Sequence, residues 1–303
     1  MGTKRLHDFV KVESTEDVLR EVKTILQRIA PIDDRRIVAA YDAIVGLYRG
    51  DFPGYQACNT YYHDLRHTVD TFLTLSRLIH GATRHNETFS DRQITLGLIA
   101  ALFHDAGYIQ EDDDKVGTGA KHTAVHVRRS MDFLSRYGAE FGLTADEIAD
   151  GRMMILCTDL SVDLSAVTHP ERRIELLGKM LGAGDILAQM ADPLYLEKLL
   201  FLYHEFKEGM IGDYEGEVDL LRKTIGFYDI ITRRLAGFAK AVDGYITAHF
   251  TERWDVHENL YTVAITNHKN YLLKILDQKD TDPREFLRRS GIVDKVREKY
   301  GAE

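Results

Sequence analysis

The chain has 303 residues, 44% of them hydrophobic and 29% charged, and a formal net charge of -9. This balance predicts a soluble globular protein with a substantial core. It argues against a partner of the nucleic-acid polymer class, because no block of Lys and Arg stands out. The two cysteines, Cys58 and Cys157, lie far apart, which argues against a disulfide framework and a Cys-ligated zinc ion.

Membrane association is not expected either. Residues 1–21 mix charged side chains with few apolar ones and lack the apolar core of a signal peptide. No apolar run approaches the roughly 20 residues that span a bilayer. We therefore expect a cytoplasmic protein without a membrane partner.

Apolar residues recur at intervals of three and four along most of the chain, and alternating β-branched runs are almost absent. Capping patterns, such as Ser90 with Gln93 and Thr144 with Glu147, indicate helix starts. The sequence thus predicts an all-α, multi-helix fold. The predicted helices span residues 15–29, 33–49, 61–80, 91–105, 119–137, 145–158, 170–190, 194–208, 215–238, 256–277 and 283–290.

A single domain over residues 1–303 is the simplest organisation, because the sequence contains no internal repeat, low-complexity segment or domain linker. Residues 1–54 are expected to form N-terminal helices that pack on the rest. Residues from about 279 to 303 are the segment most suited to a separate C-terminal appendage.

The first segment of chemical interest is Tyr61–Asp70, which contains His63 and His67. If a helix opens at Thr60 or Tyr61, these two histidines stand on a single helical face. Both imidazoles can then bind a metal, or one can bind it while its neighbour transfers protons. Surface histidine pairs at this spacing also arise by accident, so the other segments must decide.

A second segment, Leu96–Tyr108, runs from nearly uninterrupted apolar residues directly into His104 and Asp105. A helix that is apolar on every side belongs inside the protein. A buried imidazole beside a buried carboxylate is costly unless both are paired or bind a metal. The alternative is a core histidine that its neighbour satisfies.

The third segment, Met180–Met190, contains Asp185 as the only charge in an apolar helical run. The small residues Gly182, Ala183 and Gly184 just before it leave room for another element to approach. A lone aspartate in such a run is either functional or an awkward core residue. Three separate apolar helices that each present His or Asp favour a functional cluster.

His67, His104, Asp105 and Asp185 together offer two imidazole nitrogens and carboxylate oxygens. This mixed N/O set suits Zn²⁺, Mn²⁺ or Fe. Two metal ions roughly 3.5–4 Å apart would hold a hydroxide between them and clamp a phosphoryl group for in-line attack. Such local cations would also let a chain of net charge -9 accept a phosphate ester.

The order of these residues resembles the H…HD…D signature of the HD superfamily of metal-dependent phosphohydrolases. Between about Tyr55 and Leu276 the chain is also similar to the catalytic domain of class I cyclic nucleotide phosphodiesterases. The segments that carry this similarity are YYHDLRHTVD (61–70), ILCTDLS (155–161), GAGDILAQMADPLY (182–195), TIGFYDII (224–231) and NHKNYLLKIL (267–276).

The resemblance implies a helical enzyme with one or two divalent ions, Zn, Mn, Mg or Fe, in a central cleft. His67, His104, Asp105 and Asp185 would be the metal ligands. His63 would protonate the departing ester oxygen, which requires its imidazolium form. His122 is favoured over His126 as a further metal residue, with a solvated helix face as an equal alternative. Phe227 would hold the substrate as an aromatic clamp.

Three positions depart from the family pattern. Tyr108 replaces a histidine that supports the metal site, and Asp64 replaces an asparagine after the catalytic histidine. Thr224 replaces the glutamine that grips the purine edge, although it remains a candidate substrate-binding residue. The metal-binding half of the pattern is therefore kept better than the base-recognition half.

We therefore expect a metal-dependent phosphohydrolase that cleaves a phosphoester bond of a nucleotide or a related small molecule. The resemblance to cyclic nucleotide phosphodiesterases points to a cyclic nucleotide. One alternative is a nucleotidase or alarmone hydrolase that acts on linear nucleotides. Another is a metal-binding ligand sensor or scaffold without turnover. The sequence leaves open whether a helix from Asp282 builds a homodimer.

Overall fold

The computed structural model describes residues 4–278 and 280–301, and over these residues the predicted all-α, multi-helix fold is confirmed. The only β pairing within them is an isolated bridge between Tyr55 and Glu111. The α-helices are α1 (Thr15–Ile29), α2 (Arg35–Arg49), α3 (Leu65–Arg84), α4 (Asp91–Phe103), α5 (His126–Tyr137), α6 (Ala145–Leu156), α7 (Arg172–Ala191), α8 (Tyr195–Glu208), α9 (Glu217–Leu235), α10 (Ala239–Trp254), α11 (Leu260–Leu276) and α12 (Ile292–Tyr300).

Two predicted capping boxes are present. The Ser90 hydroxyl accepts from the Gln93 backbone N–H, and the Gln93 side chain accepts from the Ser90 N–H in return. Thr144 and Glu147 form the same reciprocal pair at the start of α6. These contacts satisfy backbone donors that have no partner inside the helix, which is why α4 and α6 begin where the sequence indicates.

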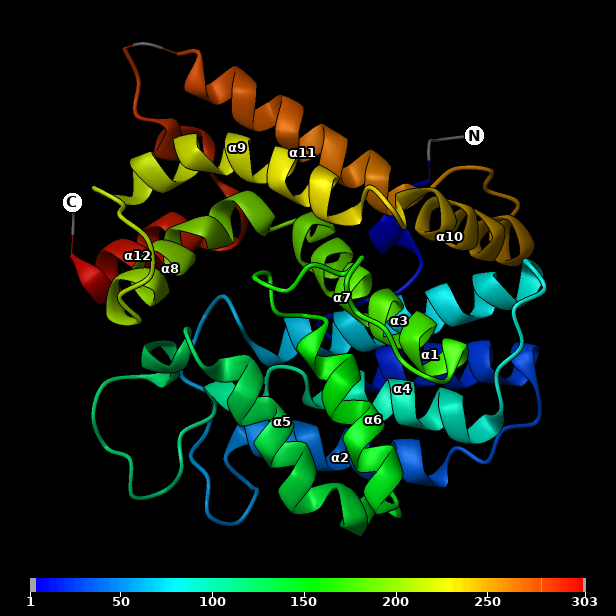
Figure 1. The fold of residues 1–303 in the computed structure, drawn as a ribbon. Coiled ribbons are helices and arrows are strands. Elements are labelled where there is room, and N and C mark those ends of the chain that lie inside the picture. Colours follow the sequence, from blue (N-terminus) through cyan, green and yellow to red (C-terminus); the bar gives the residue numbers. More distant parts are fainter. Residues whose placement is uncertain (1–3, 279, 302–303) are drawn as a thin grey trace.

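The helices pack around α3 and α7, which contact each other in the middle of the molecule. Helix α3 also contacts α1, α4 and α10, whereas α7 contacts α6 and α11. Figure 1 shows α8, α9, α11 and α12 on one side of this pair and α2, α4, α5 and α6 on the other. Elements that carry the predicted site residues therefore meet at the centre.

One hydrophobic cluster runs through the bundle, from Leu6 near the N-terminus to Val296 in α12. Helix α4 is buried on every side from Ile94 to Phe103, as its sequence predicts. Helices α1 and α2, from the predicted N-terminal part, contribute to the same cluster. Of the predicted appendage 279–303, the structure describes 280–301, and α12 packs on α8. Residues 1–3, 279, 302 and 303 lie outside the described residues.

Two helices were not predicted from the sequence. Helix α10 falls in an unassigned gap, and its buried face includes the polar residue His249 among Val242, Ile246 and Phe250. The predicted helix over 283–290 is instead a 3-10 turn, Pro283–Phe286, followed by a second short turn and then by α12. Within the described residues, no helix is both long and apolar enough to cross a membrane.

Candidate metal centre

Helix α3 brings His67 to the centre, but it begins later than predicted. Asp64 is the N-cap residue, and its Oδ1 accepts from the His67 backbone N–H at 2.9 Å. His63 therefore precedes the helix, so the prediction of a shared helical face with His67 is wrong. The two rings still lie near each other, with centroids 6.2 Å apart.

Helix α4 ends at Phe103, so His104 is its C-cap residue and Asp105 lies beyond the helix. The His104 Nδ1 lies 2.8 Å from the Ala101 carbonyl oxygen. A carbonyl only accepts, so Nδ1 carries the proton and the neutral ring keeps the lone pair of Nε2. That nitrogen lies 3.3 Å from His67 Nε2.

Helix α7 supplies Asp185, whose Oδ1 lies 3.0 Å from His67 Nε2 and 3.6 Å from His104 Nε2. A Cβ added to Gly182, three residues earlier, would stand 2.2 Å from the Cys157 carbonyl oxygen at the end of α6. The prediction that small residues before Asp185 admit another element is thus confirmed. This close approach fixes the part of α7 that carries the carboxylate.

The three elements place one ligand atom each from His67, His104 and Asp185 within 4.8 Å of one another. Asp105 adjoins this group, with its Oδ2 3.4 Å from His67 Nε2 and 3.3 Å from His104 Nε2. This oxygen is buried and has no hydrogen-bond partner. A buried acceptor without a donor is costly, and converging imidazole nitrogens and carboxylate oxygens suit a divalent transition metal. The four residues therefore fit such an ion.

The imidazoles and carboxylates of this cluster are also paired with one another electrostatically. Burial lowers the pKa of His67, but the neighbouring carboxylates of Asp105 and Asp185 outweigh burial and raise it to about 9. The pKa of His104 is also raised against burial, mainly by the Asp105 charge. Burial raises the pKa of Asp185, but His104 and His67 outweigh it and lower this pKa. A divalent cation would displace these protons and supply the positive charge.

His63 is paired with a residue that the sequence reasoning missed. Its Nδ1 lies 2.8 Å from Oε2 of Glu205, which comes from α8. The other oxygen, Oε1, accepts from the backbone N–H groups of Tyr61 and Tyr62, each at 2.7 Å. The only sequence signal is a charged residue in the buried stretch of α8, where Glu205 is 3% exposed.

Tyr108 lies between His63 and His126. Its ring stacks on His63 at a centroid distance of 4.3 Å and on His126 at 4.5 Å. Its hydroxyl lies 3.5 Å from His63 Nε2. The residue that departs from the phosphodiesterase pattern thus forms the middle of a three-ring stack beside the His67–His104–Asp185 group.

His126 faces the cluster, whereas His122 contacts the acidic loop. The His126 Nε2 lies 3.7 Å from Asp105 Oδ1, and its Nδ1 lies 2.6 Å from the Thr123 carbonyl oxygen. Burial lowers the pKa of His126, which keeps the ring neutral. The His122 Nε2 instead lies 3.3 Å from Asp114 Oδ2. The geometry favours His126 over the predicted His122. A short 3-10 helix, η3 (Gly119–His122), ends at His122, and α5 begins only at His126, so the two histidines do not share one helix face.

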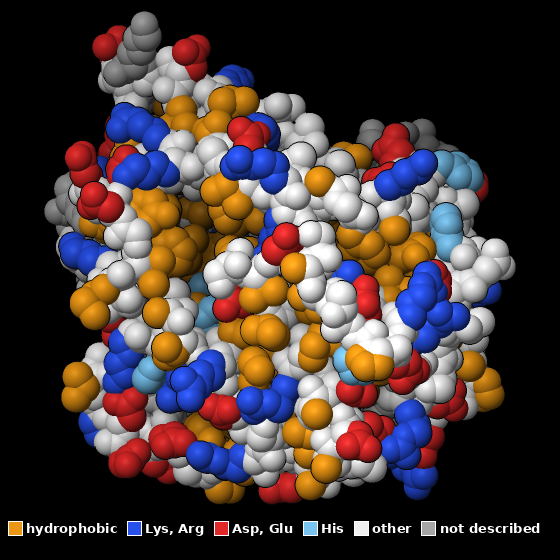
Figure 2. Space-filling model, in the orientation of Figure 1, with side chains coloured by type: hydrophobic (Ala, Val, Ile, Leu, Met, Phe, Trp, Pro, Cys, Tyr) orange, Lys and Arg blue, Asp and Glu red, His pale blue; other side chains and the backbone are white. Residues whose placement is uncertain are grey.

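The two predicted substrate residues lie on α9. Thr224 is buried, and its hydroxyl donates to the Leu220 carbonyl of its own helix at 2.8 Å. Phe227 is half-buried against the core. Figure 2 shows a hollow between α8 and α9 on one side and the segment after α6 on the other. Hydrophobic side chains surround this hollow, and histidine atoms are visible at its floor.

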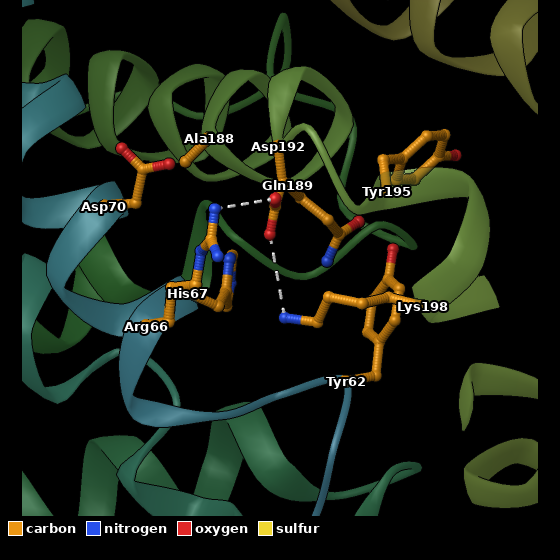
Figure 3. Close-up of a pocket in the computed structure, with 9 residues that line it drawn as sticks. All are labelled: Tyr62, Arg66, His67, Asp70, Ala188, Gln189, Asp192, Tyr195 and Lys198. Atoms are coloured by element: carbon orange, nitrogen blue, oxygen red, sulfur yellow. Dashed lines mark hydrogen bonds and ion pairs between the residues drawn. The ribbon is translucent and has the colours of Figure 1, made fainter. Parts of the chain in front are cut away.

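A second, smaller cavity adjoins His67 on the side of α8 (Figure 3). It has room for about one water molecule. Arg66 and Lys198 reach Asp192 from opposite sides, at 3.0 and 3.9 Å. These ion pairs fill the space, so this cavity is too small for a nucleotide.

A family model described as Npun_R2479-like matches residues 52–235, which is more than half of the chain. The chain belongs to the Npun_R2479-like family. The family match contains the whole cluster, from His63 to Asp185, together with Glu205. It ends before α10, α11 and α12. Among curated proteins, no sequence matches this chain.

Proposed function

We propose that this member of the Npun_R2479-like family is a metal-dependent phosphohydrolase that cleaves a phosphoester bond of a nucleotide or a related small molecule. The observation that carries the proposal is the convergence of ligand atoms from His67 in α3, His104 at the end of α4 and Asp185 in α7, all within 4.8 Å of one another. The resemblance of their order to the H…HD…D signature supports the reaction class. The His63–Glu205 pair beside them supplies a group suited to proton transfer.

His67, His104, Asp105 and Asp185 are the residues that would hold the metal. When bound, a divalent ion lowers the pKa of water and polarises a phosphoryl oxygen. Asp105 turns Oδ2 toward His67 and His104, and Oδ1 toward His126. Asp105 would therefore offer an oxygen on each side, and His126 would help to hold a second ion if two were bound.

His63 is the residue proposed to protonate the leaving oxygen. Glu205 accepts a hydrogen bond from His63 Nδ1–H, which holds the ring in one orientation and leaves Nε2 to carry the transferable proton. The Nε2 atom points toward the Tyr108 hydroxyl, at 3.5 Å, on the side of the ring stack.

The contacts of Thr224 favour a second candidate substrate class. Its hydroxyl is already used by the Leu220 carbonyl, and the residue is buried. Thr224 therefore offers no counterpart to the amide that grips a purine edge in cyclic nucleotide phosphodiesterases. This contact keeps linear nucleotides and alarmones as candidates beside cyclic nucleotides.

The proposal is tested by metal analysis followed by a substrate screen. The purified protein is stripped with a chelator, reloaded with Mn²⁺, Mg²⁺ or Zn²⁺, and incubated with cyclic nucleotides, linear nucleotides and bis(p-nitrophenyl) phosphate. Opening of a cyclic ester gives a nucleotide monophosphate without free phosphate, whereas a nucleotidase releases phosphate. Absence of metal-dependent turnover across the panel would contradict the proposal and favour the binding or scaffold role.

Two alanine variants separate metal binding from proton transfer. We expect His67→Ala to lose metal and activity together, because it removes a ligand of the central group. We expect His63→Ala to retain metal and lose about 10²–10⁴-fold in kcat, the usual contribution of a general acid. If His63→Ala turns over the active substrates at the normal rate, the assigned role of His63 is wrong.

A further inference from the structure

The last turn of α12 lies against α8 and against the segment that precedes α3. The Tyr300 ring stacks on the imidazole of His204, with centroids 3.8 Å apart and planes 5° apart. The Lys299 ammonium lies 3.8 Å from the ring centroid of Tyr61, which in turn stacks on Phe201 at 5.0 Å. The C-terminal helix therefore contacts the two chain segments that hold the His63–Glu205 pair.

These contacts fall directly beside the pair. His204 precedes Glu205 in α8, and Tyr61 lies two residues before His63. The Tyr61 backbone N–H donates to Glu205 Oε1 at 2.7 Å. The other oxygen of this carboxylate, Oε2, accepts from His63 Nδ1–H at a distance of 2.8 Å. Displacement of Tyr61 or of this turn of α8 would thus move both partners of the His63–Glu205 contact.

Ion pairs also link His204 to Arg284, which lies near the start of the chain segment that ends in α12. The His204 Nε2 lies 3.0 Å from Glu217 Oε1, and Glu217 Oε2 accepts from Arg284 at 2.8 Å. Arg284 also pairs with Asp282 at 2.8 Å. His204 is consequently contacted by Tyr300 at one end of the segment and linked through Glu217 to Arg284 at the other.

We propose that residues 282–300 form a strap that positions the His63–Glu205 pair, with Lys299 and Tyr300 as its positioning residues. Lys299 contacts Tyr61 and Tyr300 contacts His204, so each would act on the site through one of these two residues. The structural part of this inference stands on the contacts alone, and its kinetic part rests on the proposed function. The strap lies beyond the residues matched by the family model, which end at 235.

The test compares the double variant Lys299→Ala/Tyr300→Ala with the conservative double variant Lys299→Arg/Tyr300→Phe. The first removes the cation over Tyr61 and the ring over His204, whereas the second keeps both kinds of contact. Hydrogen–deuterium exchange of the peptide that spans residues 58–64 reports on the Tyr61 and Tyr62 amides without any need for turnover. We expect exchange at least about tenfold faster in the alanine variant, and near-normal exchange in the conservative variant.

The kinetic prediction is a loss of about tenfold in kcat for the alanine variant, with KM and metal content unchanged, and recovery in the conservative variant. Lys295→Ala is the matched control, since it removes an exposed lysine from the same helix. Unchanged exchange in the alanine variant would overturn the strap, whatever the activity. Faster exchange in a protein that hydrolyses no phosphoester would support the strap and contradict the proposed function.

Discussion

At the scale of single residues, Glu205 carries the sharpest prediction. We expect Glu205→Ala to lower kcat by about 10²–10³-fold, because His63 loses the acceptor that orients it. Two backbone N–H groups, of Tyr61 and Tyr62, also lose their acceptor. Metal content, measured by elemental analysis, should stay normal, because Glu205 is not among the grouped ligands.

Glu208→Ala is the matched control for this change. Glu208 lies one turn later on α8 and binds the Thr118 backbone N–H and hydroxyl at an exposed position. Its removal should leave kcat nearly unchanged. If Glu205→Ala keeps the normal kcat, or if Glu208→Ala loses as much, His63 does not depend on its contact with Glu205.

The residue types of the site could be predicted, but their local structure could not. The sequence placed His67, His104 and Asp185 in one cluster, and the structure brings them together. It also predicted His63 on α3, whereas the Asp64 cap starts that helix later. Glu205 was missed because its partners lie 142 to 144 residues away, so no local spacing reveals the contact.

At the scale of helices, the contact between α6 and α7 leaves no space for a side chain at Gly182. A Cβ at this position would lie 2.2 Å from a backbone oxygen, which cannot turn aside as a flexible side chain can. We expect Gly182→Ala to cost about 1–3 kcal/mol of unfolding free energy, as overpacked sites do. Because Asp185 lies one turn further along α7, metal affinity should also fall, by about 10–100-fold.

Gly226→Ala in α9 provides the matched control for the glycine change. A Cβ there meets nothing within 4 Å, and alanine favours a helix over glycine by about 0.5–1 kcal/mol. Chemical denaturation should therefore show a small gain in stability for Gly226→Ala. A neutral result for Gly182→Ala would mean that α6 and α7 separate without cost.

Helix prediction succeeded where the apolar pattern was uninterrupted and a cap marked the start. Helix α4 combines both signals, through Ser90 and the buried run up to Phe103. Helix α10 lacks them, since its N-cap residue Phe238 offers no side-chain acceptor and His249 interrupts its buried face. That histidine is explained only by a partner on another helix, His80 of α3, which sequence spacing does not reveal.

At the scale of the whole molecule, α3 carries His67 of the candidate metal site near one end and His80 of this histidine pair near the other. The His80 and His249 Nδ1 atoms lie 3.1 Å apart, and both residues are fully buried. One Nδ1 must donate and the other accept, so the contact requires at least one neutral ring. A Cβ on Gly81 would stand 1.7 Å from the Tyr245 carbonyl oxygen, so α3 and α10 are in close backbone contact beside the pair.

The charged groups around this pair favour its neutral form. Burial lowers the pKa of His80 to about 4; Glu252 raises it, while Arg84, Arg253 and Arg28 lower it further. Burial also lowers the pKa of His249 well below its ordinary value, and Arg77 and His80 add to this effect. Helices α1, α3 and α10 thus surround the pair mainly with positive charge.

Acid should therefore weaken the fold through His80 and His249. The unfolded chain binds protons on these rings below about pH 6.5, whereas folded His80 resists protonation down to about pH 4. The contribution to stability is complete above pH 6.5 and falls as the pH drops toward 4, by on the order of 2 kcal/mol. Denaturant unfolding of the chelator-treated protein at several pH values measures this slope.

The double variant His80→Leu/His249→Leu removes both titrating rings and replaces a buried polar pair by apolar groups, a change that can be nearly neutral at pH 7. Its unfolding free energy should fall less steeply between pH 6.5 and pH 4 than that of the unmodified chain. Both proteins keep the residues of the candidate metal site, so the contribution of those residues to the pH dependence is the same. The difference between the two slopes therefore measures the contribution of the His80–His249 pair. Parallel slopes would show that the two rings gain their protons without opening the contact between α3 and α10.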